Sequence, residues 1–297
     1  MKTVLLTGAT GQLGRELSML DWGPSLELFT PGRSELDLLS EPSVTATFER
    51  RDFAAVINVA AYNAVDQAEN DIMAAYALNA GATMLLAAAS GRRGLPFIQL
   101  STDYVFSGNK SSPYLEDDQP DPIGVYGASK LAGEIAARSG NPRSVVLRTA
   151  WLFSVHRENF VKTMRRLAKG RSEIAVVSDQ VGCPTAAGDV AAAVQTILLS
   201  HLHDRSAPSG VYHFVNEGQA SRCELAAATL AGVGCDVRPI PSSEYPTRAR
   251  RPVDSRLSTL KIARDFGVKA RPWRQALDEV LNELRELERR PATGSEV

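Results

Sequence analysis

Short apolar runs alternate with amphipathic stretches along the first half of the chain. Continuous apolar runs of about four to eight residues are typical of strands buried on both faces, and apolar residues spaced three and four apart are typical of helices. The predicted strands are 3–7, 26–30, 54–60, 96–101 and 141–149, and the predicted helices include 13–20, 41–51 and 71–90. This alternation predicts an α/β fold with a doubly wound parallel sheet covered by helices on both faces.

The pattern becomes less regular after about residue 150. Helices are expected near 159–169, 187–201 and 272–289, strands near 173–177 and 210–215, and an ordered loop over 239–258, which is rich in proline and arginine. We therefore predict a first domain over 1–150 and a second, smaller α/β domain over 151–290, from which some segments return to the first. Residues 291–297 are polar and are predicted to form a flexible tail.

Composition and charge exclude several classes of protein. The 297 residues carry 33 Lys and Arg against 34 Asp and Glu, so the chain lacks the basic excess typical of nucleic-acid binding. Three cysteines without close spacing predict neither disulfides nor a zinc site. No apolar run reaches the length of a signal-peptide core or a membrane span. We expect a cytoplasmic protein with neither a membrane nor a nucleic acid as partner.

A glycine-rich turn, TGATGQLG, lies between the first predicted strand and helix. Gly8 would allow the sharp turn, Gly11 would let the backbone approach a pyrophosphate, and Gly14 would let the helix pack closely on the sheet. The helix N-terminus would supply N–H donors to the phosphates. The turn therefore predicts a dinucleotide site, to which we also assign three of its other residues: Thr10, Gln12 and Leu13.

The end of the second strand bears on the choice of dinucleotide. A carboxylate there would favour NAD, whereas this chain has Gly32-Arg33, and an arginine can pair with the 2′-phosphate of NADP. Arg33 therefore favours NADPH, with NADH left open, because the same residue could be an ordinary surface arginine. Asp37 and Leu38 follow closely and could contact the adenine or its ribose.

Three side chains could carry acid–base chemistry. In VYGASK, Tyr126 and Lys130 lie four residues apart at the start of a predicted helix and so project from one face. A neighbouring ammonium group would lower the pKa of a tyrosine, which is ordinarily about 10. Thr102, in STDYVF, follows a predicted strand at the carboxyl edge of the sheet, where doubly wound folds bind ligands.

These features resemble the short-chain dehydrogenase/reductase superfamily, with its Rossmann fold and its hydroxyl, tyrosine and lysine triad. Ten segments in order are similar to the dTDP-4-dehydrorhamnose reductase family: TGATGQLG, VAAYNAVDQAE, STDYVFSG, PYLEDD, VYGASKLAGE, RTAWLF, NFVKTM, DQVGCPT, GVYHF and RPVDSRLS. The resemblance implies NADPH-dependent reduction of the C4 keto group of dTDP-4-dehydro-6-deoxy-L-hexose to dTDP-L-rhamnose. Tyr126 would then be the proton donor, assisted by Lys130 and Thr102.

The same resemblance assigns further site residues. Ala60, Ala61 and Tyr62 would line the nicotinamide ribose. Val65, Asp103, Tyr104 and Trp151 would surround the deoxysugar, although Trp151 could equally be a core residue. Candidates to hold the substrate diphosphate are Lys162, Arg165, Arg248, Arg250, Arg251 and Arg256.

The chain also departs from the family pattern. Asn63, Ala150, Phe153 and Arg222 occupy positions where threonine, serine, tyrosine and an aromatic residue are common, which leaves another nucleotide-linked 4-keto sugar open as the substrate. Some family members bind Mg²⁺ at a dimer interface through a glutamate placed like Glu16. The partner ligands are not evident, so we assign no metal-binding residues, and Mg²⁺ and a homodimer both stay open as carry-overs from the resemblance. A further alternative is a non-catalytic NADP-binding regulatory subunit.

Overall fold

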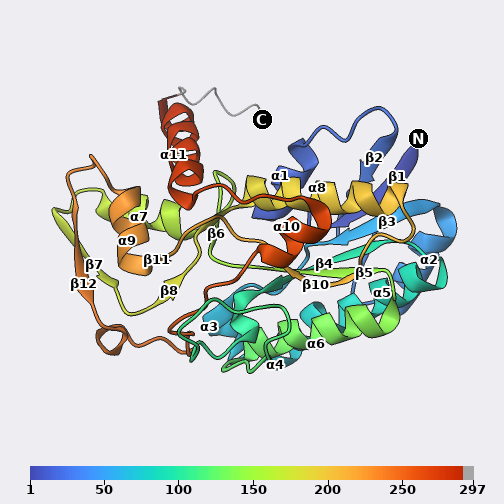
Figure 1. Ribbon diagram of the computed structural model, residues 1–297, viewed down its shortest axis with the longest axis horizontal. Helices are drawn as coiled ribbons and strands as arrows, with labels where there is room; N and C mark the ends of the chain where they lie inside the picture. The colour runs from blue at the N-terminus through green and yellow to red at the C-terminus, as the bar shows by residue number, and fades with distance from the viewer. Residues whose placement is uncertain (290–297) are drawn as a thin grey trace.

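The computed structural model describes residues 1–289 and has a central six-stranded parallel sheet between two layers of helices (Figure 1). The strands are β1 (Lys2–Thr7), β2 (Leu26–Phe29), β3 (Phe53–Asn58), β4 (Phe97–Thr102), β5 (Ser144–Thr149) and β10 (Gly210–His213). Their order is β10-β5-β4-β3-β1-β2, and every neighbouring pair is parallel. The predicted doubly wound α/β fold is confirmed. The tail predicted for 291–297 lies outside the described residues.

The order of the strands creates a crevice at one edge of the sheet. The chain runs from β1 to β2 on one side and then returns to β3 on the other side of β1. The connections that leave β1 and β3 therefore diverge, and such a switch point at the carboxyl ends of parallel strands is where doubly wound folds bind ligands. The turn after β1 that contains Gly8 and the segment after β3 that contains Ala60 lie at this point.

Helices bury the apolar residues of each sheet face. On one face, α1 (Gln12–Met19) and α8 (Ala187–His203) pack over β1, β3, β4 and β5, with Leu17 and Val194 in the core. On the other face lie α2 (Glu41–Arg50), α5 (Ala82–Arg92) and α6 (Val125–Gly140). The inner strands β1, β3 and β4 read as nearly continuous apolar runs because both of their faces are covered, whereas the edge strand β2 has an exposed Glu27.

The predicted helix 71–90 is present but is not uniform. It consists of α4 (Ile72–Tyr76), a π-helical segment η1 (Ala77–Gly81) and α5, and it follows the short α3 (Val65–Ala68). By length and composition this helical run could cross a membrane, yet Leu86 and Ala87 of α5 are fully buried in the core of the fold. The π segment holds Asn79, whose amide donates to Ser129 Oγ and whose Oδ1 accepts from the Tyr62 backbone N–H at 2.8 Å. The widened turn thus positions the loop after β3.

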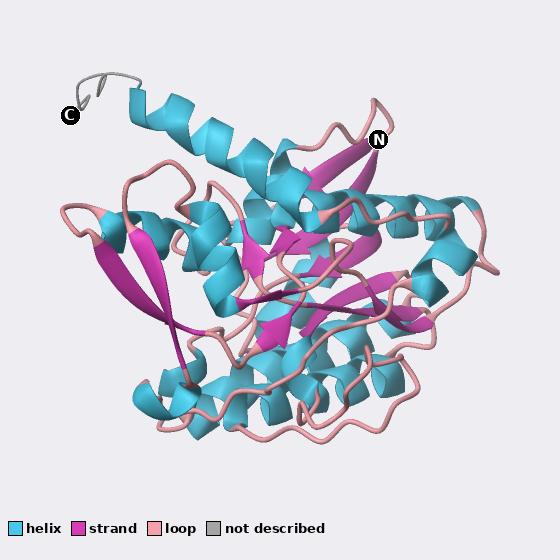
Figure 2. Cartoon of the chain, turned by 60° about the vertical axis from the view of Figure 1, so that its left-hand side comes forward, coloured by secondary structure: helices cyan, strands magenta, loops and turns pink. Residues whose placement is uncertain are grey.

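Smaller elements extend from the carboxyl edge of the sheet (Figure 2). Three two-stranded ladders pair β7 (Glu173–Val177) with β12 (Asp236–Ile240), β8 (Val181–Gly182) with β11 (Ala220–Ser221), and β6 (Leu152–Phe153) with β9 (Thr185–Ala186). The helices of this region are α7 (Phe160–Ala168), α9 (Arg222–Thr229) and α11 (Trp273–Arg289), whereas α10 (Leu260–Phe266) packs against β10 and α8 of the main layers. The loop expected over 239–258 overlaps the end of β12, which includes Pro239. Proline has no N–H to donate, and it is tolerated here because β12 has a strand partner on one side only.

The second half of the chain contributes directly to the first. Strand β10 pairs with β5, and α8 packs on α1. Two functional regions therefore share one sheet. Residue 150 marks the point where the alternation of strands and helices becomes less regular. That it separates a cofactor domain from a substrate domain stays a prediction.

Candidate active site

The glycine-rich turn folds in the way that its residues predict. Gly8 has φ +76°, and a Cβ there would lie 2.5 Å from the Ala60 backbone nitrogen. A Cβ on Gly14 would clash with the Gly8 carbonyl oxygen. A Cβ on Gly11 would lie 3.3 Å from the same oxygen and would otherwise have open space around it within residues 1–289. Gly11 is the N-cap of α1 and no side chain caps the helix, so its first N–H groups stay available to an anion. These residues fit a dinucleotide phosphate.

A cleft of about 550 Å³ opens beside this turn. Of the residues predicted to bind the cofactor, those that line it are Gly8, Thr10, Gly11, Gln12, Arg33, Asp37, Leu38, Ala60 and Ala61. Leu13 lines the neighbouring cavity instead. Tyr62 lines neither cavity: its hydroxyl donates to Asp71 Oδ2 at 2.8 Å. The structure thus gathers nine of these predicted residues around one cleft.

Arg33 and Asp37 occupy the loop after β2. Both are exposed, and Asp37 Oδ1 accepts from the Leu39 backbone N–H at 3.0 Å. Within residues 1–289 the Arg33 guanidinium has no ion pair. An unpaired guanidinium at the edge of the cleft can take a phosphate bidentately.

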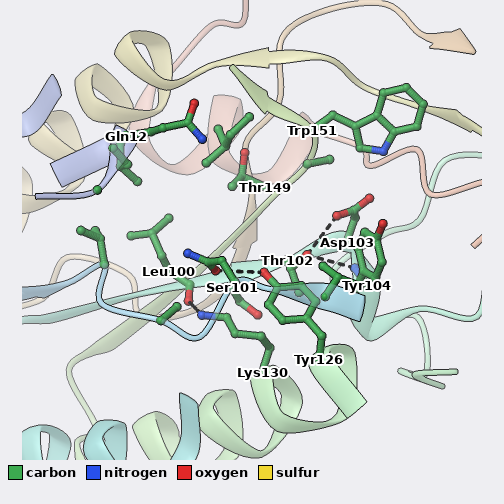
Figure 3. Close-up of a pocket in the computed structure, with 18 of the residues that line it drawn as sticks. Gln12, Leu100, Ser101, Thr102, Asp103, Tyr104, Tyr126, Lys130, Thr149 and Trp151 are labelled. Atoms are coloured by element: carbon green, nitrogen blue, oxygen red, sulfur yellow. Dashed lines mark hydrogen bonds between the residues drawn. The ribbon is translucent and has the colours of Figure 1, made fainter. Parts of the chain in front are cut away.

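The second cavity, of about 350 Å³, contains the predicted catalytic side chains (Figure 3). Tyr126 and Lys130 project from the first turns of α6, and Thr102 ends β4. The Thr102 hydroxyl donates to Asp103 Oδ1 at 3.0 Å and accepts from the Tyr104 backbone N–H at 3.2 Å. All three side chains line one cavity, which also reaches Gly11 and Gln12 of the turn.

The protonation of Tyr126 suits a proton donor. Burial raises the pKa of its hydroxyl, while the Thr102 hydroxyl acts in the opposite direction. The lowered pKa that the sequence predicts for Tyr126 is therefore wrong, because desolvation outweighs the neighbouring hydroxyl, and the group keeps its proton at neutral pH. Tyr126 also donates a long hydrogen bond of 3.5 Å to Asn63 Oδ1, from the loop after β3.

Lys130 lies beneath the tyrosine, one helical turn further along α6. Its ammonium donates to the Leu100 carbonyl at 2.6 Å, and burial lowers its pKa to about 8. The group is thus still mainly charged at neutral pH. A positive charge here can stabilise negative charge that develops on Tyr126.

A buried ion pair fixes the helix that carries these residues. Arg148 Nη2 of β5 lies 2.6 Å from Glu134 Oε2 of α6, and both side chains are only 3% exposed. Ser101 Oγ of β4 donates to the same carboxylate. Because α6 is tied to both strands one turn beyond Lys130, the spacing between Thr102 and the helix is held firmly.

The remaining predicted substrate residues line the far side of this cavity: Val65, Asp103, Tyr104 and Trp151. Asp103 is buried, and this burial raises its pKa to about 6 even though Ser255, Thr102 and Arg222 act in the opposite direction. Its Oδ2 atom has no hydrogen-bond partner among residues 1–289. This oxygen has almost no solvent-accessible surface, so a ligand would reach it only if a neighbouring side chain moved.

Trp151 lies in the cavity wall with a strained backbone. Its φ is +47°, which is unusual for a bulky residue, and its indole ring lies against Gly182, where a Cβ would be 2.5 Å from a ring carbon. Backbone strain of this kind concentrates at functional sites. Of the two interpretations open for Trp151, its position in the wall favours a contact with ligand.

Arg222 connects this cavity to a third one. Its guanidinium carbon lies 3.5 Å from the centre of the Trp151 ring and 5.3 Å from that of Phe160. With Tyr104 and Phe160 it lines both the 350 Å³ cavity and an adjoining cavity of about 770 Å³. Within residues 1–289, Arg222 is in no ion pair with a carboxylate within 4.0 Å. It is thus a cation with access to both cavities.

Most of the predicted diphosphate residues already have partners. Arg251 pairs with Asp66 at 2.7 Å, Arg165 pairs with Glu288 at 2.7 Å, and Arg256 pairs with Asp254. Lys162 donates to the Val155 carbonyl, and of the six candidates only Arg251 lines the 770 Å³ cavity. Sequence reasoning gave no role to Arg222 or Asn63, although it marked both as departures from the family pattern. It gave no signal at all for Phe160.

A metal site is not evident. Within residues 1–289 no group of three or more His, Cys, Asp and Glu side chains is gathered closely enough to hold an ion. Glu16, the residue considered for Mg²⁺, lies beside Gly188. The triad itself can move a proton without a metal.

The fold, the glycine-rich turn and the Thr102, Tyr126 and Lys130 triad define a Rossmann-type oxidoreductase of the short-chain dehydrogenase/reductase class. Residues 1–286 match the model of the RmlD substrate binding domain family, so the chain belongs to that family.

Its similarity to known proteins extends over nearly the whole chain. It is 41% identical to dTDP-4-dehydrorhamnose reductase of Sinorhizobium fredii, over 91% of this chain and 94% of the relative. It is 40% identical to dTDP-4-dehydrorhamnose reductase of Burkholderia thailandensis, over 95% of this chain and 98% of that relative. Among solved structures, the dTDP-4-dehydrorhamnose reductase of Bacillus anthracis in complex with NADP is 34% identical, with a TM-score of 0.87 over 95% of this chain and all (100%) of that one.

Proposed function

We propose that this protein uses NADPH to reduce the C4 keto group of dTDP-4-dehydro-6-deoxy-L-hexose, giving dTDP-L-rhamnose. The observation that carries the proposal is the triad of Thr102, Tyr126 and Lys130 in a cavity that adjoins the cleft of the glycine-rich turn. The names of the similar proteins support the particular substrate. Each of the three side chains has a defined part in this reaction.

NADPH, when bound, supplies the hydride. Tyr126 gives its proton to the substrate oxygen at C4 as negative charge develops there. Thr102 would turn its hydroxyl from Asp103 Oδ1 to donate a hydrogen bond to the same oxygen, which orients the carbonyl. Lys130, protonated at neutral pH, stabilises the phenolate that Tyr126 leaves behind, and its position below the tyrosine also suits a contact with the cofactor ribose.

The substrate would lie across both cavities. The deoxysugar would occupy the 350 Å³ cavity, which Asp103, Tyr104 and Trp151 line, and the nucleotide would extend into the 770 Å³ cavity. Arg222 would hold the diphosphate at the junction, because its guanidinium lines both cavities and makes no ion pair within 4.0 Å among residues 1–289. Arg222 thus takes the role of diphosphate ligand that the sequence predicted for several other basic residues.

The test is NADPH oxidation by the purified protein with a panel of dTDP-4-keto-6-deoxy sugars. Turnover with the L-lyxo-configured substrate, well above that with its C3 or C5 epimers, is the expected result. Preference for another sugar would transfer the proposal to the alternative 4-keto-sugar reductase. Tight NADPH binding without turnover on any member would favour the regulatory subunit. The homodimer and the cytoplasmic location stay predictions.

A further inference from the structure

A loop from the second half of the chain reaches the cofactor cleft. Residues 154–159 connect β6 to α7, and Arg157 and Glu158 of this loop line the 550 Å³ cleft together with Gly11, Gln12 and Arg33. These two residues are more than a hundred positions away from the glycine-rich turn in the sequence. Neither the glycine motif nor the family resemblance gave them a role.

Arg157 has a backbone conformation that favours glycine. Its φ is +57°, and among residues 1–289 only Trp151 is another non-glycine residue with positive φ. Trp151 lines the reaction cavity, so both strained residues lie at ligand sites. A long cationic side chain kept in a conformation that glycine would adopt more easily indicates a role for the side chain itself.

The guanidinium of Arg157 is free to bind an anion. The residue is exposed, and within the described chain its side chain makes no ion pair and no hydrogen bond. The neighbouring carboxylate of Glu158 lies 3.7 Å from Arg166 Nη2 of α7, which partly compensates its charge. Arg157 is therefore a cation at the cleft with no internal partner.

Hydrogen bonds hold the loop against the N-terminus of α1. Asn159 Nδ2 donates to Gln12 Oε1 at 3.0 Å and to the Ser154 carbonyl at 2.7 Å, while Asn159 Oδ1 caps α7 by accepting from the Lys162 N–H. Ser154 Oγ accepts from the His156 N–H at 2.9 Å. The loop is thus fixed beside the helix end that would receive the pyrophosphate, whereas Arg33 follows β2 and lies at the adenosine side.

We propose that Arg157 is a ligand of the cofactor pyrophosphate, supplied by the substrate-binding half of the chain. The inference rests on the proposed function only in that a nicotinamide dinucleotide occupies the cleft. The guanidinium would pair with the phosphate oxygens on the side opposite the α1 N–H groups. Because NADPH and NADH share the pyrophosphate, Arg157 would contribute equally to both, and Arg33 to NADPH alone.

The experiment compares the full-length wild type with Arg157→Gly, Arg157→Gln and Arg33→Gln. Equilibrium fluorescence titration gives the Kd for NADPH and for NADH, and thermal unfolding of the cofactor-free proteins gives Tm. Both Arg157 variants should weaken the two dinucleotides alike, by about tenfold, as expected for the loss of one charge-assisted phosphate contact. Arg33→Gln should weaken NADPH only. Arg157→Gly should keep or raise Tm, because glycine relieves the strain at φ +57°.

Three results would overturn the inference. Unchanged Kd values in both Arg157 variants would show that the guanidinium does not contact the cofactor. A loss confined to NADPH would assign Arg157 to the 2′-phosphate instead, and a weaker Kd together with a lowered Tm in Arg157→Gly would indicate a merely structural role. Failure of the wild type to bind either dinucleotide is a distinct result, since it would remove the proposed function as well.

Discussion

The cofactor side and the proposed substrate side of the site differ in the groups that would bind phosphate. On the cofactor side, the phosphate site is made mainly by backbone: a turn at Gly8 and an uncapped helix that begins after Gly11, with the exposed Arg33 and Arg157 at the edge of the cleft. On the substrate side it is made by side chains, and most of the arginines expected there pair with carboxylates of the same chain. A backbone site is encoded by a short local motif, whereas a side-chain site depends on which charges the fold leaves unpaired.

The largest expected effect tests the chemistry that lies between these two sides. Tyr126→Phe removes the proton donor but keeps the aromatic ring, which packs edge-on against the Tyr104 ring with 5.5 Å between the ring centres. We expect kcat to fall by about 10³-fold and the Kd for NADPH to change little. Stopped-flow or steady-state NADPH oxidation and fluorescence titration measure the two quantities. Retained turnover would remove Tyr126 from the mechanism.

Gly8→Ala tests the backbone side. The new Cβ would lie 2.5 Å from the Ala60 nitrogen at φ +76°, so the turn must shift, and we expect affinity for NADPH to drop by more than about tenfold. Gly23→Ala is the matched control, because Gly23 has φ +70° with open space around it and lies outside the site. Both variants should lose some Tm, but only Gly8→Ala should lose binding in the titration. Equal binding in the two would contradict a backbone-made site.

Arg222→Gln tests the side-chain side. Loss of the unpaired guanidinium should raise KM for the nucleotide sugar by about tenfold and leave the Kd for NADPH unchanged. Arg238→Gln is the control, since Arg238 lines the same 770 Å³ cavity but is paired with Glu173 at 3.1 Å. Initial-rate kinetics give KM for the nucleotide sugar in both variants. A similar KM increase in the control would show that the cavity attracts its ligand through overall charge and not through one residue.

Asp103→Asn has the smallest expected effect on activity and the most specific pH dependence. The pKa of Asp103 is about 6 in the fold against an ordinary 3.8, so its ionised form opposes folding fully above about pH 6 and not at all below pH 3.8. The variant should gain up to about 3 kcal/mol of stability at pH 7.5, from roughly two pKa units at 1.36 kcal/mol each, and the gain should disappear as pH falls toward 4. Urea unfolding at several pH values measures it.

Asp52→Asn, at a fully exposed carboxylate, should show no such pH-dependent gain. Asp103→Asn should also raise KM for the sugar substrate, because the carboxylate that lines the cavity and accepts from the Thr102 hydroxyl is replaced. A variant that is less stable at pH 7.5, or that has an unchanged KM, would remove Asp103 from the substrate site.

The sequence predicted the fold well because local signals agree with it. Buried parallel strands require continuous apolar runs, and the glycine turn requires glycine at Gly8 and Gly14 for steric reasons, so both appear as short patterns. The triad was also visible, since Tyr126 and Lys130 share one helix face and Thr102 ends a strand. The π segment at 77–81 was not visible, because its cause is a tertiary contact of Asn79.

Charge was harder to interpret than pattern. The proline- and arginine-rich loop was expected to supply diphosphate ligands, yet Arg251 and Arg256 pair with Asp66 and Asp254, which no local spacing reveals. Arg222 and Arg157 come from other segments, and their roles depend on being unpaired after folding. Which cation stays free is a property of the whole tertiary structure.

The strand β10 has a consequence for how this protein is made. Because Gly210–His213 pairs with β5, the central sheet is incomplete until more than two thirds of the chain has left the ribosome. Until then β5 presents an open edge, which is a hazard for pairing with other chains. For the same reason the second half of the chain cannot be exchanged between relatives as a separate cassette, because it carries a strand of the central sheet.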